Sequence, residues 1–527
     1  QLILVQPFLV RVQASQPMTL ADARVFCFFA SSVPSPQPLC VSRALHYPRD
    51  MTELQHAIKA ASTRPRIQPA EEGDRRPLSV SARLGRLQFH NSGKFRVLQL
   101  TDIQDGPKIG ADTIKLIEAS LDATRPDIVV FTGNQIAGYD AAYASTMRKR
   151  QWSRPNGSAA DRERYSTALE HTRDLVRATI GQLTRPLIER GVPWAVTFGN
   201  HDFQCGLGDA EIEAICKEFP GCLNPGAAES SGTPRGMADD AAYEASRDAA
   251  CDGSADAARN GFHDGSDDGA NNASPLPEQR VYACEPGTFA LPVADAGRTR
   301  DVLGLVLLDS GDYARSGGYG SPSAVALRFL ADAPHRMASS GMDTLPCMVF
   351  QHFALAQYYQ LLKPAAANAA HAIEGYRGFA GRHYTLDEDR VQAGGYLGEG
   401  VSCPDADSGE FTILRNNGYF AISAGHDHRN AFVGTMDGVM MIASPTSGFG
   451  SYGPVPAKRA ARLIEFDIRH PYQPRTQLLE YGELVGKPSA GKAYIYGMTS
   501  ESKPDSEGMD LLHRPTWWSK LLSWVRR

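Results

Sequence analysis

The chain has 527 residues, of which 42% are hydrophobic, and this is ample apolar material for a large buried core. Its formal net charge of −5 gives no overall basic signature, so nucleic acid is not expected as a partner. No run of residues approaches the length and apolarity of a membrane span.

The first 90 residues are the least regular part of the sequence. Residues 1–90 mix apolar, proline-containing and arginine-bearing pieces, and we expect a poorly ordered N-terminal extension. The apolar run Gln1–Val12 is short and no clean small-residue cleavage site follows it. The sequence therefore assigns neither a signal peptide nor a cellular location.

From residue 95 onward, short apolar runs alternate with helical patterns. Strands are predicted at 95–100, 127–131 and 194–198, with helices at 112–123 and 162–190 between them. This order is typical of βαβ units. Later runs predict a second sheet that packs on the first, with strands at 419–423, 431–434, 439–443 and 462–468.

Residues 91–485 are predicted to form one large domain with two insertions. The first insertion, 226–286, is rich in Ala, Gly, Ser and Asp, which predicts a flexible acidic loop. The second, 365–410, predicts a loop near the site entrance, where loops commonly select substrates. The tail 486–527 ends in a basic amphipathic pattern, which suits either an anionic membrane surface or docking on the protein's own body.

Metal-binding side chains follow several of the apolar runs, at Asp102, Asn200, His352, His426 and His428. Loops that leave strand ends converge, so these distant positions are expected to meet at one rim. Their oxygen and imidazole donors suit Zn, Mn or Fe, and the lack of clustered thiols argues against a soft thiolate site. Two such ions can clamp a phosphoryl group, so the pattern predicts a binuclear site that hydrolyses a phosphate ester.

Five segments, in this order, resemble the motifs of the calcineurin-like metallophosphoesterase family: TDIQ at 101–104, FTGN at 131–134, GNHD at 199–202, QH at 351–352 and GHDH at 425–428. The segments 308–313, 318–320 and 447–453 are similar to the branch of that family related to purple acid phosphatases. The resemblance implies an α/β fold, a four-layer α/β/β/α sandwich of the metallo-dependent phosphatase type. It also implies two divalent or trivalent metal ions (Mn, Zn or Fe) and a phosphate-ester substrate.

The resemblance implies a role for each matching position. The ligands of the first metal would be Asp102, Gln104 and His428, those of the second Asn200, His352 and His426, and Asn134 would bridge both. His201, held by Asp202, would stabilise the transition state or protonate the leaving oxygen.

Two positions depart from the family pattern, which usually has His where this chain has Gln104 and a bridging Asp where it has Asn134. A neutral amide bridges two cations poorly compared with a carboxylate, so the first metal site should be weakened. Asp105 and Asp140 lie shortly after the altered positions and could compensate in principle, but nothing in the sequence shows that they reach the metal.

Three functional alternatives follow from these departures. The first is a working binuclear phosphoesterase, which the intact GNHD and GHDH motifs favour. The second is an enzyme with one tightly held metal at Asn200, His352 and His426. The third is a catalytically impaired relative that binds phosphate or a phosphoprotein without cleaving it.

Nine cysteines are scattered along the chain without a CxxC pair, so a zinc knuckle is not expected. Cys205, Cys216 and Cys222 are close enough in sequence to form disulfides in an exported protein. The odd total leaves at least one thiol over.

Overall fold

A computed structural model describes residues 2–5, 8–11, 76–151, 159–226, 276–339 and 341–487. The chain divides into two compact units, Gln1–Pro65 and Arg66–Arg527. The described residues of the first unit form one antiparallel hairpin of β1 (Leu2–Val5) and β2 (Phe8–Arg11). Most of the predicted acidic insertion and the whole C-terminal amphipathic end lie outside the described residues, as does most of the predicted N-terminal extension.

The first sheet of the second unit has the strand order β17-β16-β3-β4-β5. Strands β3, β4 and β5 are parallel, and helices α3 and α4 return the chain between them, because parallel neighbours need a crossover connection. Strand β16 pairs antiparallel with β3, and β17 completes this edge. The bounds are β3 Lys94–Leu100, α3 Ala111–Thr124, β4 Ile128–Thr132, α4 Ala159–Glu189, β5 Trp194–Thr197, β16 Ala460–Asp467 and β17 Arg475–Glu480.

The second sheet has seven strands in the order β14-β15-β13-β9-β8-β7-β6. Its central strands β8, β9, β13 and β15 are parallel, whereas β6, β7 and β14 join antiparallel at the edges. The bounds are β6 Tyr282–Glu285, β7 Thr288–Ala294, β8 Asp301–Leu308, α7 Ala324–Met337, β9 Cys347–Gln351, α8 Glu410–Asn416, β13 Tyr419–Ala424, β14 Val433–Met436 and β15 Val439–Ala443.

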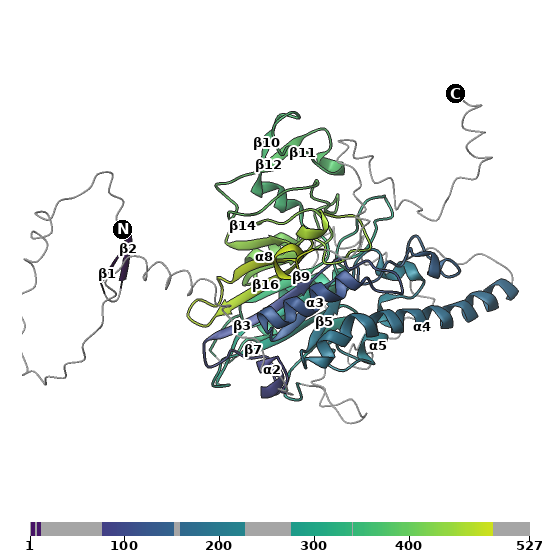
Figure 1. The fold of residues 1–527 in the computed structure, drawn as a ribbon, viewed down its shortest axis with the longest axis horizontal. Coiled ribbons are helices and arrows are strands. Elements are labelled where there is room, and N and C mark those ends of the chain that lie inside the picture. Colours follow the sequence, from purple (N-terminus) through teal and green to yellow (C-terminus); the bar gives the residue numbers. More distant parts are fainter. Residues whose placement is uncertain are drawn as a thin grey trace, which may run out of the picture. The chain divides into compact units, whose positions relative to one another are not determined.

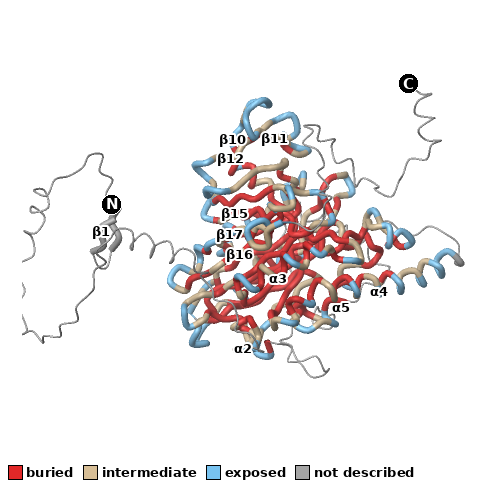
Figure 2. The backbone as a smooth tube through the Cα atoms, viewed as in Figure 1, coloured by how far each residue is buried: buried red, intermediate tan, exposed pale blue. Residues whose placement is uncertain are grey.

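The two sheets pack face to face and helices cover both outer faces (Figure 1). Successive side chains of β3 point to opposite faces of the first sheet. Val97 joins the core between the two sheets, whereas Leu98 joins the core under α3 and α4. On the other side, Leu330 of α7 and Leu414 of α8 pack against the seven-stranded sheet. Figure 2 shows buried residues running through both sheets. The predicted four-layer α/β/β/α sandwich is confirmed.

One predicted strand belongs to a different sheet from the one expected. The run 462–468 was expected in the second sheet, whereas β16 lies in the first sheet, with Leu463 opposite Leu98 of β3. A strand's own side-chain pattern shows that it is buried but does not show which strand it pairs with.

The predicted second insertion contains a small antiparallel sheet of its own. Strands β10, β12 and β11 pair in that order within residues 362–386. The bounds are β10 Leu362–Ala365, β11 Ile373–Glu374, η6 Arg377–Phe379 and β12 His383–Leu386. Rings of Tyr359 and Phe379 stack at 3.6 Å between centroids and fasten this sheet to the preceding η5 (Ala356–Leu361).

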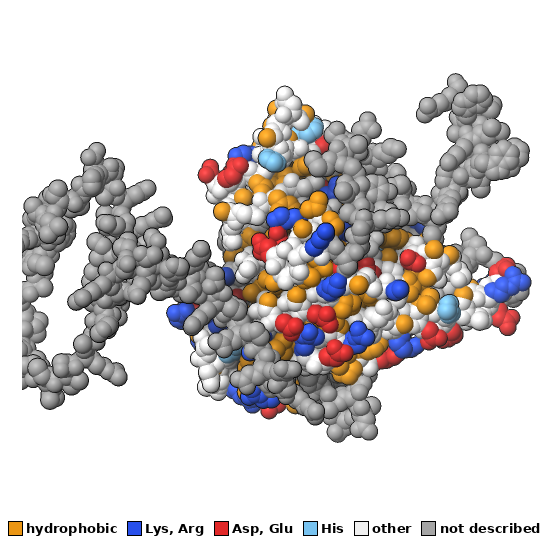
Figure 3. Space-filling model, viewed as in Figure 1, with side chains coloured by type: hydrophobic (Ala, Val, Ile, Leu, Met, Phe, Trp, Pro, Cys, Tyr) orange, Lys and Arg blue, Asp and Glu red, His pale blue; other side chains and the backbone are white. Residues whose placement is uncertain are grey.

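The remaining elements are short, and helix surfaces carry mixed charge. Their bounds are α2 Val80–Leu84, η2 Ala141–Tyr143, η3 Asp202–Cys205, α5 Asp209–Lys217, η7 Pro456–Lys458 and α9 Tyr481–Leu484. On the face shown in Figure 3, acidic and basic side chains are interspersed. Helix α4 carries ion pairs of Arg173 with Glu170 and of Arg177 with Asp174. Within the described ranges, the helices are too short or too polar to cross a membrane.

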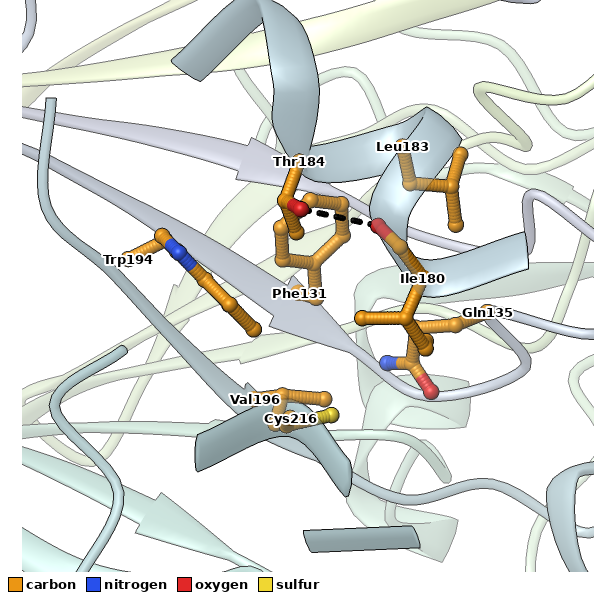
Figure 4. A pocket seen from close by; sticks show the side chains of 8 residues that line it. All are labelled: Phe131, Gln135, Ile180, Leu183, Thr184, Trp194, Val196 and Cys216. Carbon is orange, nitrogen blue, oxygen red and sulfur yellow. Dashed lines mark hydrogen bonds between the residues drawn. The ribbon is translucent and has the colours of Figure 1, made fainter. Parts of the chain in front are cut away.

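A small cavity of about 10 Å³ lies between α4 and the first sheet (Figure 4). Its volume is about that needed for one water molecule, and its walls are mostly apolar. The lining residues are Phe131, Gln135, Ile180, Leu183, Thr184, Trp194, Val196 and Cys216. None of the predicted site residues lines it, so this cavity is part of the core and not the candidate site.

The described cysteines form no disulfide. Cys205, Cys216 and Cys222 are free and buried, as are Cys347 and Cys403, and the half-buried Cys284 is free as well. The sequence left disulfides among Cys205, Cys216 and Cys222 open, and in this structure these three thiols are free. These thiols serve as small apolar side chains in the core under α4 and α5.

Candidate functional site

Five parallel strands, three from the first sheet and two from the second, each lead into a predicted site residue. Strands β3, β4 and β5 precede Asp102, Asn134 and Asn200, whereas β9 and β13 precede His352 and His426. Side chains from these loops meet because the loops leave the carboxyl ends of their strands. The predicted site residues are thus brought together from both halves of the sandwich.

The backbone at this edge adopts a conformation that most side chains avoid. Four of the predicted residues have positive φ angles, which are 51° at Asp102, 43° at Gln104, 55° at Asn134 and 67° at His426. Non-glycine residues in this region cost free energy and cluster at functional sites. The repeated positive φ indicates that the loops are shaped to aim these residues inward.

The carboxamide of Asn134 lies at the centre of the site. Its Nδ2 atom is 3.0 Å from Asp102 Oδ1, 3.2 Å from Asn200 Oδ1 and 2.9 Å from His352 Nε2. Asn134 is fully buried, and so are its three partners. An N–H₂ group therefore points at the atoms that the family resemblance assigns to metal ions.

The orientation of this carboxamide is fixed by its other end. The backbone N–H of His201 donates to Asn134 Oδ1 at 2.9 Å, and an N–H group can only donate. The oxygen of Asn134 must therefore face His201, and the nitrogen must face Asp102, Asn200 and His352. A flipped carboxamide would place its own N–H₂ against the His201 N–H.

Two of the histidines are oriented by backbone carbonyl groups. His352 Nδ1 donates to the Thr132 carbonyl at 2.9 Å, so its Nε2 lone pair faces Asn134. His428 Nδ1 lies 2.7 Å from the Tyr452 carbonyl, and its Nε2 lies 3.3 Å from Asp102 Oδ1. Both rings thus present Nε2 to the centre of the site.

His426 is held by its backbone and by aromatic neighbours. Its backbone N–H donates to Asp102 Oδ2 at 2.7 Å. Its ring centroid lies 4.5 Å from that of Tyr319, 4.7 Å from that of Phe353 and 5.0 Å from that of His352. The Nδ1 atom is buried and has no hydrogen-bond partner among the described residues. Its Nδ1 lone pair is therefore open to a ligand.

The predicted contact between His201 and Asp202 is wrong. Asp202 accepts hydrogen bonds from the backbone N–H groups of Gly199 at 2.8 Å and Asn134 at 2.7 Å, so it ties two site loops together. His201 Nδ1 instead lies 2.8 Å from Gln204 Oε1. Burial lowers the pKa of His201 to about 4, so the ring is neutral near pH 7, and its Nδ1–H donates to Gln204.

The side chains expected near the first metal, those of Gln104, Asp105 and Asp140, are each hydrogen-bonded to other groups. Gln104 Oε1 accepts from the Tyr139 hydroxyl at 3.2 Å. Asp105 turns toward the start of α3, where its Oδ2 accepts from Gly110 N and Thr113 Oγ1, each at 2.8 Å. Asp140 caps η2 by accepting from Ala142 N at 2.8 Å. Neither carboxylate compensates for Gln104 or Asn134.

The site combines one buried carboxylate with several buried imidazoles. Burial opposes ionisation of Asp102, but the neighbouring His352 and His428 outweigh it and hold the pKa of Asp102 well below its usual range. Burial likewise opposes a charge on His428, whose pKa is nevertheless raised by Asp102. Burial lowers the pKa of His352 and of His426. Asp102 and His428 therefore form an ion pair within a mostly neutral site.

The donor set does not fit a binuclear metal centre. At the bridging position, Asn134 presents N–H donors where two cations would need a shared anionic oxygen. Among the described residues, no three His, Cys, Asp or Glu side chains are arranged to hold a metal ion. At the second position, Asn200 Oδ1, His352 Nε2 and His426 Nδ1 are suitable atoms, but Asn134 already donates to the first two.

Several aromatic residues that contact the site were not predicted as site residues. The Tyr313 hydroxyl accepts from Asn200 Nδ2 at 2.8 Å, which turns Asn200 Oδ1 toward Asn134. Tyr139 lies against His201 at 4.9 Å between centroids. A signal for Tyr313 and Tyr319 was present, because both fall in the segments that resemble the purple acid phosphatase branch. For Tyr139 no sequence signal pointed to this contact.

The fold and the convergence of these motif residues define the class of protein. The chain is similar to the calcineurin-like metallophosphoesterases. Its named relatives include proteins called purple acid phosphatases. It matches no protein-family model.

Two of the named relatives match most of the chain at low identity, and a third matches a shorter part. "Probable inactive purple acid phosphatase 29" of Arabidopsis thaliana is 21% identical over 419 residues, which cover 74% of this chain and 82% of the relative. "Probable inactive purple acid phosphatase 28" of the same plant is 23% identical over 403 residues, covering 72% and 77%. The phosphatase DCR2 of Saccharomyces cerevisiae is 29% identical over 160 residues, covering 28% and 22%.

Two solved structures are also similar. A dimetal phosphatase from Danio rerio aligns over 73% of this chain and 99% of its own, with a TM-score of 0.32 and 10% identity. GAP50, the anchor in the inner membrane complex of Plasmodium, aligns over 74% and 87%, with a TM-score of 0.35 and 9% identity.

Proposed function

We propose that this protein binds a phosphate ester at the Asn134 site and does not hydrolyse it by a binuclear metal mechanism. One observation carries the proposal, namely that Asn134 Nδ2 donates toward Asp102, Asn200 and His352 in an orientation fixed by His201. This is the third of the alternatives that the sequence allows. The relatives named as probable inactive phosphatases agree with it.

The physical reason lies in the difference between a carboxylate and a carboxamide. Two metal ions roughly 4 Å apart repel each other, and a shared anionic oxygen offsets that repulsion. Asn134 provides no charge, and its only oxygen already accepts a hydrogen bond from His201. We therefore expect the pair of ions that activates water in this class to be absent or weakly held.

Binding of a phosphate group remains chemically reasonable at this place. The family acts on phosphate esters, and the loops that would receive the phosphate keep the GNHD and GHDH motifs. A phosphate oxygen would compete for the Asn200 Nδ2 hydrogens, which now face the Tyr313 hydroxyl at 2.8 Å and His201 Nε2 at 3.4 Å. Hydrogen bonds to a charged oxygen are each stronger than those between neutral groups.

The proposal is tested by measuring binding and turnover on one preparation. Calorimetry with inorganic phosphate should detect binding, and an aryl phosphate monoester and diester should remain intact with Mn, Zn, Fe or Mg added in turn. Metal-dependent turnover with about two ions bound per chain, abolished by His426→Ala, would contradict the proposal and restore the binuclear phosphoesterase.

A second candidate, a phosphoesterase with one metal ion, is favoured by a separate observation. His426 Nδ1 is buried without a hydrogen-bond partner among the described residues, as a nitrogen reserved for a cation would be. With Asn200 and His352 it would hold a single ion, which would supply Lewis acidity toward a phosphoryl oxygen. About one zinc ion per chain, lost in His426→Ala, together with slow turnover would favour this candidate.

A further inference from the structure

Three consecutive basic residues, Arg148, Lys149 and Arg150, are fastened beside the site by one glutamine. The backbone N–H of Arg148 donates to the Gln204 carbonyl at 3.0 Å, and Gln204 Nε2 donates to the Lys149 carbonyl at 3.4 Å. Gln204 Oε1 is also the partner of His201 Nδ1. We call residues 148–150 the basic segment, and its position is coupled directly to His201.

Arg150 contacts Tyr313, which is hydrogen-bonded to the site residue Asn200. Its guanidinium carbon lies 4.0 Å from the ring centroid of Tyr313, whose hydroxyl accepts from Asn200. Stacking uses the flat face of a guanidinium and leaves the in-plane N–H groups available. Arg150 is thus pre-oriented next to Asn200 with donors still to offer.

The positive charge of Arg150 is not neutralised within the described part of the chain. Its single hydrogen bond there is from Nη1 to the Lys149 carbonyl at 3.3 Å, and no ion pair joins it to a described carboxylate. The Nε2 of the neighbouring Gln151 donates a hydrogen bond to Asp209 Oδ2 at 2.9 Å. Arg148 Nε is buried and has no hydrogen-bond partner among the described residues. Arg150 and the Nε of Arg148 therefore keep donors for an anion.

We propose that the basic segment binds a second phosphoryl group of a ligand whose first phosphate lies at the Asn134 site, so that the preferred ligands are diphosphates. This inference rests on the proposed function and names its ligand class. A guanidinium matches the geometry of phosphate oxygens with paired hydrogen bonds, and Arg150 beside Asn200 provides that group. An orthophosphate at the Asn134 site alone leaves Arg150 unused, whereas a diphosphate engages both.

Calorimetry with inorganic pyrophosphate and inorganic orthophosphate, without added metal, tests this inference. Wild-type protein should bind pyrophosphate about tenfold more tightly than orthophosphate, and Arg150→Ala should remove about that factor from pyrophosphate alone. Arg150→Lys should restore only part of it, since an ammonium cannot make the paired contact. Thermal melts of each variant confirm that the fold is retained.

A matched control is Arg415→Ala. Arg415 is also a half-exposed arginine, paired with Asp437 at 3.2 Å, but it lies at the edge where β13 and β15 begin, whereas the site lies where the parallel strands end. This variant should bind pyrophosphate like the wild type.

The outcomes separate this inference from the proposed function. Equal loss of pyrophosphate affinity in Arg150→Ala and Arg415→Ala, or no loss in either, would overturn the role of the basic segment even if orthophosphate binds. No binding of either anion by wild type would overturn both. An Arg150-dependent preference for pyrophosphate together with rapid metal-dependent hydrolysis would uphold the basic segment and overturn the non-hydrolytic function.

Discussion

The backbone N–H of His201 donates to the side-chain oxygen of Asn134 at 2.9 Å, and this contact decides which way the Asn134 carboxamide faces. The loops that carry the two residues approach closely. A Cβ atom at Gly199 would lie 2.4 Å from Asn134 Oδ1, which explains why glycine precedes Asn200 and His201. The site is therefore built around an inward-facing N–H₂ group, and the predictions below follow from it.

Asn134→Ala should destabilise the protein by about 2–4 kcal/mol. The change leaves the buried acceptors Asn200 Oδ1 and His352 Nε2 without their donor and removes the acceptor of the His201 N–H, and each unsatisfied buried group costs about 1–3 kcal/mol. Urea unfolding measures the effect. Asn368→Ala, the same change at an exposed position, is the control and should stay within about 0.5 kcal/mol of wild type. Equal stabilities of the two variants would show that Asn134 does not hold the site together.

Removal of metal ions should leave the thermal stability of the wild type almost unchanged. The Asn134 carboxamide already occupies acceptor atoms of Asn200 and His352 that would otherwise need a cation. A ligand stabilises a fold only as far as it binds the folded state. We expect melting temperatures with and without EDTA to agree within about 1 °C. A fall of several degrees that Zn or Mn reverses would indicate a metal centre on which the fold depends.

Gln204→Ala should weaken pyrophosphate binding about three- to tenfold and should also destabilise the fold by about 1–3 kcal/mol, because it leaves the partly buried His201 Nδ1–H without its acceptor. Gln204 links His201 to the basic segment, so its loss frees both groups and adds an entropic cost to binding. Calorimetry measures the affinity, and Gln473→Ala, an exposed glutamine, serves as the control. Equal affinities of the two variants would rule out this coupling.

Glu410 should make the protein less stable as the pH rises. It is almost completely buried at the start of α8, and burial raises its pKa from 4.5 to about 8. A group with a raised folded-state pKa contributes stability fully below the unfolded value of 4.5, and this is lost as the pH rises toward 8. The loss should approach about 1.4 kcal/mol per pH unit in that window.

Glu410→Gln tests this dependence. Glutamine keeps the shape and does not ionise, so urea unfolding at pH 5, 6, 7 and 8 should show a shallower pH dependence in the variant. Burial is the largest cause of the raised pKa of Glu410, and a side-chain hydrogen bond with Gln351 opposes that rise. Identical slopes for wild type and variant would mean that Glu410 is ionised in the folded protein.

The local elements of the fold follow from the sequence because their signals are local. The predicted helix 112–123 matches α3 (Ala111–Thr124), and the predicted strand 95–100 matches β3 (Lys94–Leu100), each within one residue at either end. Apolar spacing reports burial directly. The pairing of β16 with β3 depends instead on a partner more than 300 residues away, and no local pattern encodes it.

The sequence predicted which residues gather at the site, but it did not predict which side chains hydrogen-bond to one another there. The motif order placed Asp102, Asn134, Asn200, His352 and the GHDH histidines together, and the structure joins them by hydrogen bonds and ring contacts. Asp202 was expected to hold His201 because it is adjacent in sequence, yet adjacent side chains rarely face the same way. Gln204, three residues after His201 along η3, takes that place.

Metal stoichiometry is the most direct test of the central claim that Asn134 and Gln104 prevent a binuclear centre. Wild type and the double variant Gln104→His, Asn134→Asp are loaded with Mn or Zn, freed of excess ion by gel filtration, and analysed for metal content and aryl phosphate turnover. We predict at most about one ion per chain and no turnover for the wild type, and about two ions with measurable turnover for the variant, because a bridging carboxylate and a further imidazole are restored. Two ions and turnover in the wild type would contradict the account.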